Sequence, residues 1–349
     1  MNDVANQLID IIIPNWNGEE MLDMCLSSLR KQTCQKFTVT VVDNGSIDGS
    51  LDLLKDQYPE VRVLSFKENR GFSAAVNTGI KKTGNTWILL LNNDIEVAEE
   101  CIEILRNHCL NQDEFDLFAL KMLSFDQRSM LDGAGDGIMR GGVGYRLGTM
   151  EQDGPHYQLR RNVFGACAGA ALYRRTLFEA IGLFDEDFFA YLEDVDLNLR
   201  AVRSGRKCFY LPDAKIYHIG SGSTGSKINQ FTIRLSTRNN IFIFIKHYSL
   251  SMIMRFFPTI LIYQLFWFMF VLKNGHIKAY LKGLVQSISL TATMIRKRED
   301  IKRSTVISTK ALGDMIIASE TDVIHSIMAR RRQAGKNNWA LKAYLRVFC

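Results

Sequence analysis

A short polar cluster, Asn92-Asn93-Asp94, is the first stretch of this sequence that could do chemistry. It follows Trp87–Leu91, an unbroken apolar run typical of a strand covered on both faces. Ligands bind beyond the carboxyl ends of the strands in an open parallel sheet, so Asp94 is expected at the mouth of a site. A carboxylate there suits a hard divalent cation, which balances the charge of a diphosphate. The simpler alternative is a turn or a helix cap, where Asn and Asp are common.

A second acidic cluster opens a predicted helix at 191–203, where Glu193, Asp194 and Asp196 fall in the first turn. The helix dipole favours carboxylates at that end of a helix whatever their function. A carboxylate held at a helix start beside an apolar surface can also act as the general base for a substrate hydroxyl.

His218 ends the strand-like segment 214–218 and precedes GSGSTGSK, a Gly/Ser stretch that we expect to form a mobile flap. A single histidine is more often structural than a ligand. Together with Asp94 and a substrate diphosphate, however, His218 would complete a reasonable Mn²⁺ or Mg²⁺ shell.

Strand-like and helix-like segments alternate four times up to these first polar residues. Strands are expected at 8–13, 37–42, 61–66 and 87–91. Apolar residues at helical spacing follow the first strand and predict a helix there. Further helices are expected at about 48–57 and 72–82. This alternation predicts an α/β fold with a parallel sheet and right-handed crossovers.

The turns of this unit lack the glycine motifs of dinucleotide enzymes and P-loop proteins, which disfavours redox cofactors and P-loop chemistry. Polar residues stand there instead, among them Asn17 and Asp43. Asp43 can accept a hydrogen bond from a pyrimidine or a ribose hydroxyl, whereas Arg70 and Gly71 can approach a phosphate. Ordinary turn chemistry explains each of them equally well.

The periodic signal weakens between 95 and 160. Glycine is dense in DGAGDGIMRGGVGYRLG, at 132–148. We interpret this stretch as a long loop on the acceptor side of a site, or as a lid, because long loops are uncommon unless they have a function.

Taken in order, seven segments resemble the family-two glycosyltransferases of the GT-A fold, and most closely their rhamnosyltransferase-like branch, which builds bacterial cell-surface polysaccharides. The resemblance covers about residues 8–226 and continues into 228–248. Each segment is weak alone and the ordered set is specific. The segments are IIPNWNG, VVDNGSIDGS, ENRGFSAAVNTGI, LLLNNDIEV, FDEDFFAYLEDVDLNLR, YHIGSGST and STRNNIFIFIKHY.

This resemblance implies inverting transfer of a sugar, rhamnose or a related hexose, from a dTDP- or UDP-linked donor to a hydroxyl of a lipid-linked or glycan acceptor. It also implies a Rossmann-like nucleotide-binding sheet. By similarity the nucleotide sugar is bound by Pro14, Asn17, Asp43, Arg70, Gly71, Asn77 and Asn93. The metal ligands are Asp94 and His218, and the catalytic pair is Glu193 and Asp194, with Asp194 as the base.

One position departs from the family pattern. Asn92 stands where the D-x-D motif of the family has its first acid. The protein therefore offers the cation one carboxylate fewer, and we expect weak metal binding without the donor. A cation between Asp94 and His218 would take up the charge of the leaving diphosphate without an acid, and one carboxylate is enough to deprotonate the acceptor.

The charge is divided unevenly along the chain. Residues 1–226 carry 23 Lys and Arg against 32 Asp and Glu, whereas residues 227–349 carry 20 against 5. The tail also holds the uncharged run Phe256–Leu272, interrupted by Pro258 and Gln264. We expect a glycosyltransferase domain at 1–226 and a basic, amphipathic helical region at 227–349. The tail helices are expected to lie on the anionic inner face of the cell membrane.

Other partners and other functions stay open at this point. The alternative for the tail is a buried hairpin at a homodimer interface, and nucleic acid is disfavoured because no binding module is recognisable. Seven cysteines without a C-x-x-C pair, and no secretory signal, favour a cytoplasmic protein. The alternative functions are a non-catalytic glycan-binding or assembly subunit and a sugar-phosphate nucleotidyltransferase. The latter should carry a Gly-rich basic loop after the first strand, and IIIPNWNGEE does not.

Overall fold

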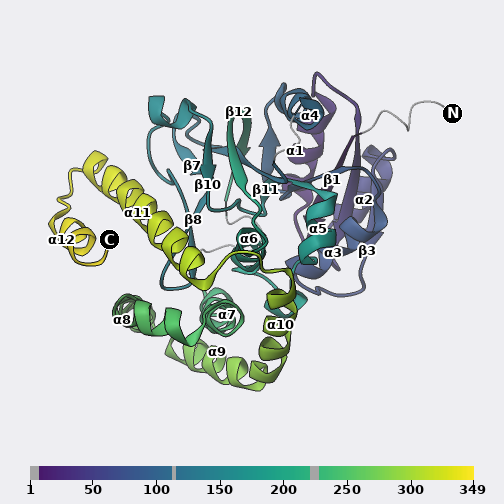
Figure 1. Cartoon of the computed structure of the whole chain (residues 1–349). Coiled ribbons are helices and arrows are strands. Elements are labelled where there is room, and N and C mark those ends of the chain that lie inside the picture. The colour runs from purple at the N-terminus through teal and green to yellow at the C-terminus, as the bar shows by residue number, and fades with distance from the viewer. Residues whose placement is uncertain (1–7, 112–114, 221–227) are drawn as a thin grey trace.

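The computed structural model describes residues 8–111, 115–220 and 228–349. Most of its strands belong to one mixed sheet (Figure 1). The strands are β1 (Ile9–Asn15), β2 (Phe37–Asp43), β3 (Arg62–Ser65), β4 (Trp87–Leu91), β5 (Ile95–Val97), β6 (Leu117–Ser124), β7 (Leu131–Ala134), β8 (Asp136–Met139), β9 (Val143–Arg146), β10 (Arg161–Val163), β11 (Ala170–Arg174) and β12 (Cys208–His218).

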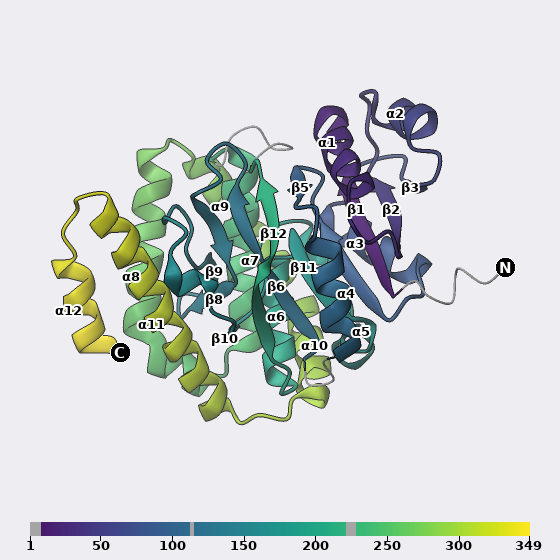
Figure 2. The same ribbon diagram turned by 90° about the horizontal axis from the view of Figure 1, so that it is seen from above.

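Helices cover both faces of the sheet and form a separate layer at the C-terminal end (Figures 1 and 2). The helices are α1 (Glu19–Arg30), α2 (Ser50–Gln57), α3 (Phe72–Lys82), α4 (Cys101–Asn111), α5 (Arg175–Ile181), α6 (Glu193–Arg203), α7 (Gln230–His247), α8 (Leu250–Lys273), α9 (Ile277–Ser289), α10 (Thr291–Ser304), α11 (Thr309–Gln333) and α12 (Trp339–Phe348).

The expected α/β alternation is confirmed in the first third of the chain. Strands lie in the order β3-β2-β1-β4, and each neighbouring pair is parallel. Beyond β4 the sheet becomes mixed, because β11 runs antiparallel to both β4 and β6. The apolar run of β4 is buried along its whole length, as expected of a central strand. The carboxyl ends of β1, β2 and β4 therefore meet at one edge.

The prediction of a long loop at 132–148 is wrong. This stretch forms β7 and the hairpin β8–β9, which packs between α6 and α11. The glycines allow close approach: a Cβ atom on Gly144 would lie 2.8 Å from Val195 of α6, and one on Gly137 would lie 2.5 Å from Val323 of α11. Dense glycine here reflects tight packing of a strand against helices rather than an irregular loop.

The C-terminal helices share a core with the sheet domain. Val195 of α6 and Ile138 of β8 belong to the same buried cluster as Phe242 of α7 and Ile316 of α11. The expected domain boundary after residue 226, and most of the expected Gly/Ser flap, lie outside the described residues. The helical region thus supports the hairpin and the start of α6, two elements that also border the site described next.

Candidate active site

A cavity of about 580 Å³ opens at the carboxyl edge of the sheet, between β1, β4 and the start of α6. It gathers seven of the eleven residues selected from the sequence. These are Pro14, Gly71, Asn93, Asp94, Glu193, Asp194 and His218.

Asp94 and His218 are brought together by a strand pairing. β12 runs antiparallel to β5 and sets His218 opposite Ile95, the residue after Asp94. The imidazole Nε2 of His218 lies 3.3 Å from a carboxylate oxygen of Asp94. Burial lowers the pKa of His218, but its hydrogen bonds to Asp132 and Asp94 outweigh burial and raise that pKa to about 9. Two residues 124 positions apart in the sequence thus form one polar pair.

Asp132 is a residue that sequence reasoning missed. It lies in β7, and its carboxylate accepts a hydrogen bond from Nδ1 of His218 at 2.7 Å. The same carboxylate forms an ion pair with Arg146 of β9. A carboxylate on one imidazole nitrogen fixes the ring, and a metal ion bound between Nε2 and Asp94 would replace the proton that these two groups share. No sequence pattern marks Asp132, because its role depends on a hairpin that the glycine-rich sequence does not predict.

The acidic start of α6 also faces the cavity. The chain enters the helix through Tyr191 and Leu192, whose φ angles of 69° and 65° are unusual for residues with side chains. Such local strain often accompanies functional sites. Asp194 accepts a hydrogen bond from the backbone N–H of Val195 at 2.8 Å. This irregular entry directs the first turn of α6 into the cavity.

The two carboxyl groups at this helix start differ in their pKa values. Burial and the neighbouring charge of Asp194 raise the pKa of Glu193 to about 8. Burial also raises the pKa of Asp194, although hydrogen bonds from three backbone N–H groups and the charge of Arg146 oppose it. Near neutral pH Glu193 is therefore mostly protonated, and Asp194 is the better candidate for an ionised base.

Asp43 does not line the cavity but supports its wall. It is fully buried and accepts a hydrogen bond from the side-chain amide of Asn15 at 3.2 Å. The amide oxygen of Asn15 in turn accepts a hydrogen bond from Asn93 at 2.7 Å. This chain of hydrogen bonds joins the ends of β2, β1 and β4. Asn15, which lines the cavity, was not selected from the sequence.

Asn17, Arg70 and Asn77 also lie outside the cavity lining. Asn17 has a φ angle of 49° and accepts a hydrogen bond from the N–H of the loop residue Ile47 at 2.8 Å. Arg70 is exposed and stacks over the Phe66 ring. Asn77 is buried, and its amide donates to the carbonyl oxygen of residue 184 at 2.8 Å. In the structure Asn17 and Asn77 hold neighbouring loops together, whereas Arg70 contacts its own loop.

Several further cavity residues were not selected from the sequence. The cavity wall includes Trp16, Asp136, Arg146 and Cys167. Among the described lining residues, Arg146 and His218 carry the basic groups, and burial of Arg146 is offset by its acidic neighbours, which keep the pKa of Arg146 above its usual value. The cavity therefore combines fixed positive charge with several buried carboxyl groups.

Comparison with known proteins places this chain in a family. The model of the family described as "Glycosyl transferase family 2" matches residues 10–182. N-acetylglucosaminyl-diphospho-decaprenol L-rhamnosyltransferase of Mycobacterium tuberculosis is 27% identical over 240 residues, which cover 62% of this chain and 78% of that protein. The PGL/p-HBAD biosynthesis glycosyltransferase of Mycobacterium bovis is 30% identical over 201 residues, covering 56% and 70%.

A solved structure agrees on the fold. GalNAc-T7, crystallised with UDP, GalNAc and Mn²⁺, superposes with a TM-score of 0.63 at 15% identity, covering 90% of this chain and 57% of that one. The GT-A fold and the likeness to rhamnosyltransferases, both expected from the sequence motifs, are thereby confirmed. The chain belongs to glycosyl transferase family 2.

Proposed function

We propose that this protein transfers a sugar, rhamnose or a related hexose, from a dTDP- or UDP-linked donor to a hydroxyl of a lipid-linked or glycan acceptor, with inversion at the anomeric carbon. The observation that carries the proposal is the meeting of Asp94, His218 and Asp194 in one cavity. The names of the mycobacterial relatives, a rhamnosyltransferase and a glycosyltransferase, support the reaction class.

Asp94 and His218 would hold Mn²⁺ or Mg²⁺, and the residues present fit such an ion. Nδ1 of His218 is engaged by Asp132, and Nε2 lies 3.3 Å from the Asp94 oxygen. That spacing resembles the separation of about 3 Å between adjacent ligands of one small divalent cation. When bound, the cation supplies the positive charge that the leaving diphosphate requires. Asn92 contributes no carboxylate, so binding should strengthen when donor phosphates complete the shell.

Asp194 acts as the general base. It takes the proton of the acceptor hydroxyl while the hydroxyl oxygen forms a bond to the anomeric carbon of the donor sugar. The bond from that carbon to the diphosphate breaks on the opposite face, and the electron pair leaves with the nucleoside diphosphate. Attack from the opposite face inverts the anomeric configuration. The proton then passes from Asp194 to water.

Donor binding and transfer provide the test. The full-length protein should gain thermal stability with dTDP or UDP sugars when Mn²⁺ is present, because these ligands bind the native state. A short-chain polyprenyl-diphosphate sugar is then offered as acceptor, and the anomeric configuration of the product is read by NMR. Asp94→Asn should lose the Mn²⁺-dependent part of the stabilisation.

The alternative functions give different results in the same experiment. Nucleotide binding without transfer or donor hydrolysis would favour a non-catalytic subunit. Release of inorganic pyrophosphate from a nucleoside triphosphate and a sugar phosphate would identify a nucleotidyltransferase. A product with retained configuration would contradict the single-base mechanism.

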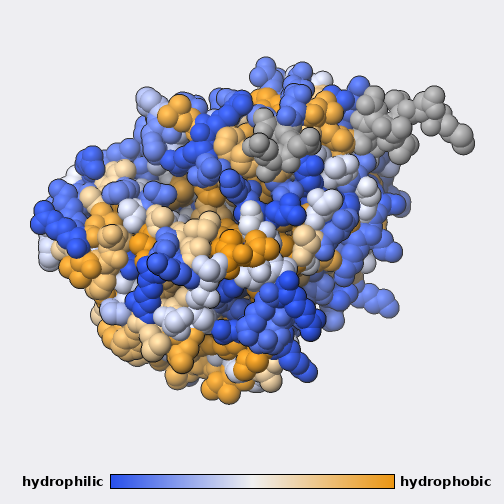
Figure 3. All heavy atoms as spheres, in the orientation of Figure 1, coloured by the Kyte–Doolittle hydropathy of each residue, from blue (hydrophilic) through white to orange (hydrophobic). Residues whose placement is uncertain are grey.

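We also propose that the C-terminal helices rest on the cytoplasmic face of the membrane. α8 is long and apolar enough to cross a membrane, and only 17% of its most apolar stretch is buried in the structure. The surface over α8 and α9 is largely hydrophobic (Figure 3), and exposed lysines lie beside it. The exposed apolar side chains include Phe257, Leu261, Leu265, Phe266, Met269 and Phe270 of α8 and Leu281, Val285 and Ile288 of α9.

Vesicle flotation tests this second proposal. The protein should float with vesicles rich in anionic lipid and much less with neutral ones, because both apolar and basic groups contribute. Replacing Phe266 and Phe270 by Asp should abolish flotation, whereas Leu159→Asp, at an exposed loop leucine, should not. Dimerisation through the same face, without binding to vesicles, would contradict the proposal and favour a homodimer.

A further inference from the structure

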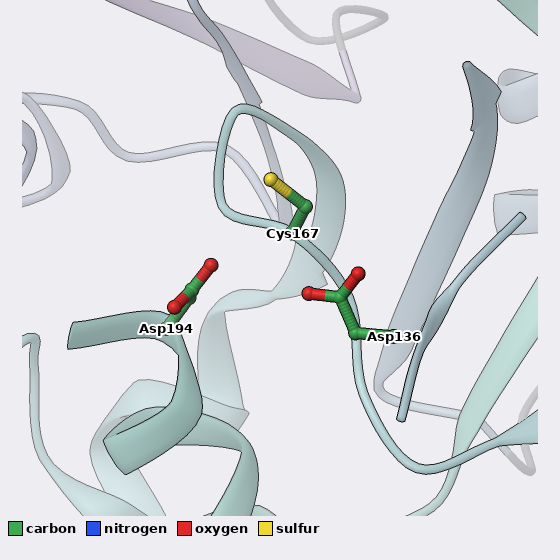
Figure 4. Close-up of side chains that lie close together, drawn as sticks. All are labelled: Asp136, Cys167 and Asp194. Carbon is green, nitrogen blue, oxygen red and sulfur yellow. The ribbon is translucent and has the colours of Figure 1, made fainter. Parts of the chain in front are cut away.

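Two neighbouring carboxyl groups, one of them buried, lie in the wall of the cavity. Asp136 begins β8, and Asp194 lies in the first turn of α6. One ligand atom from each carboxyl group and the sulfur of Cys167 all lie within 4.8 Å of one another. Figure 4 shows the carboxyl groups of Asp136 and Asp194 turned toward each other, with the thiol beside them. The proposed base therefore has a second carboxyl group as a close neighbour.

The surroundings of Asp136 do not favour its ionised form. Its side chain is 7% exposed, and its Oδ1 atom has no hydrogen-bond partner among the described residues. The charged groups that face it are Asp194 of α6, Asp132 of β7 and Arg146 of β9. Arg146 already pairs with Asp132, so one cation is shared among three carboxyl groups. A buried carboxylate without its own partner is costly, and protonation removes that cost.

We propose that the pair of Asp136 and Asp194 holds one proton at neutral pH, and that Asp136 keeps this proton while Asp194 is ionised. Asp136 is then a positioning residue, because it lies beside the carboxylate of the base without adding a second negative charge. Burial and the charge of Asp194 raise the pKa of Asp136 well above its usual value, which agrees with this assignment. The inference rests on the proposed function only for the role of Asp194 as base.

The thiol of Cys167 adds no charge to this pair. Burial and the neighbouring Asp136 raise the pKa of Cys167 above its usual value, so the thiol stays protonated at neutral pH. Cys167 therefore offers a matched control, because it touches the same space but takes no part in sharing the proton.

Infrared spectroscopy of the full-length protein tests the proton directly, through the C=O stretch of a protonated carboxyl group. The measurement is made in Glu193→Gln, because Glu193 also holds a proton near neutral pH. A protonated carboxyl band should be present at pH 7 and should disappear when Asp136→Asn is added. With Asp194→Asn instead, the band should titrate at least about one pH unit lower, since the neighbouring charge is gone. Cys167→Ala should leave its midpoint unchanged.

Two spectroscopic outcomes would contradict the proposal that Asp136 holds the proton of the pair. One is a band that survives Asp136→Asn, and the other is a titration midpoint that Asp194→Asn does not move. Asn has nearly the shape of Asp, and thermal unfolding reports whether each variant is folded. If Asp136→Asn fails to fold, the Asp194→Asn titration still decides the question.

The pH profile of sugar transfer gives the functional readout. In the wild type, Asp136 should ionise at alkaline pH and place two negative charges side by side. Asn cannot ionise, so kcat/KM of Asp136→Asn relative to wild type should rise by about threefold or more from neutral to alkaline pH. A constant ratio would contradict the positioning role. Absence of any transfer alongside the expected infrared behaviour would instead refute the proposed function and leave the carboxyl pair standing.

Discussion

Two carboxylates of α6, two residues apart, have opposite environments. Asp196 is completely buried and lies 2.5 Å from Lys246, 2.9 Å from Arg200 and 2.9 Å from His247. Burial alone would raise the pKa of Asp196, but the charges of Lys246 and Arg200 hold it well below its usual value. Asp194, by contrast, faces the cavity, and its pKa is raised.

This difference separates a carboxylate that holds helices together from the carboxylate that we propose as the base. Asp196 joins α6 to the end of α7, so its charge is used to hold two helices together. Asp194 accepts backbone hydrogen bonds, and the charge of Arg146 acts on it without a direct ion pair. Its carboxylate is therefore able to accept a proton. Sequence position and residue type do not distinguish Asp194 from Asp196. The two carboxylates differ in the number and kind of groups that contact them.

The largest effect should come from removing the cavity carboxylate. Asp194→Asn keeps the shape of the side chain but cannot accept the acceptor proton, so transfer should fall by about 10²-fold to 10⁴-fold. Thermal unfolding should change little, because no ion partner is lost. Transfer is measured under saturating donor and Mn²⁺. Near wild-type activity in a folded Asp194→Asn protein would remove the base assignment.

The structural carboxylate should give the reverse result. Asp196→Asn removes the closest partner of Lys246, which is 3% exposed and, among the described residues, keeps only its ion pair with Asp185, and it leaves buried Arg200 without its ion pair. Breaking a buried ion pair from one side costs about 3 kcal/mol or more, so unfolding in urea should occur at a much lower concentration. The folded fraction should still transfer sugar. Asp213→Asn, which breaks an exposed pair with Arg160, is the control and should cost less than about 1 kcal/mol.

Asp132 combines features of Asp196 and Asp194. It forms an ion pair with Arg146, as Asp196 does with its partners, but it also orients His218 in the cavity. Asp132→Asn should weaken the binding of Mn²⁺ by about 10-fold to 100-fold, because the ring of His218 loses the carboxylate that orients it. The measurement is Mn²⁺ binding in the presence of a nucleoside diphosphate. Excess Mn²⁺ should restore most of the transfer activity. A loss of transfer that Mn²⁺ does not restore would mean that Asp132 has another role.

The sequence predicted the parallel half of the sheet well because its strands are buried on both faces and end in polar clusters. α3 and β4 were placed with their observed bounds, and Asp94, His218 and Asp194 do lie in one cavity. These residues could be selected because the order of the family motifs is visible in the chain.

The remainder depends on contacts that a linear pattern does not contain. Glycines at 132–148 suggested a loop, but they permit strands to pack against α6 and α11, and this hairpin supplies Asp136 and Arg146 to the cavity. Asn77 was assigned to the donor pocket, yet its amide is used on a carbonyl oxygen of a neighbouring loop. The sequence does not distinguish Asp196 from Asp194, because the partners of Asp196 are Lys246 of α7 and Arg200, one turn later in α6.

The smallest expected effect concerns Glu193, which tests whether cavity carboxyl groups reduce stability. Its pKa is about 8 in the folded protein against an ordinary value of 4.5. Between these two pH values the unfolded chain releases the proton while the folded chain keeps it, so this group makes stability fall as pH rises.

Glu193→Gln removes that dependence of stability on pH. Its Tm relative to wild type should therefore increase from pH 5 to pH 8 by several degrees and then level off. Glu60→Gln is the control, because Glu60 pairs with Arg30 at the surface and has a lowered pKa, so its Tm difference should stay constant over this range. A constant difference for Glu193→Gln as well would mean that Glu193 is ionised in the cavity and would make it a rival to Asp194 as the base.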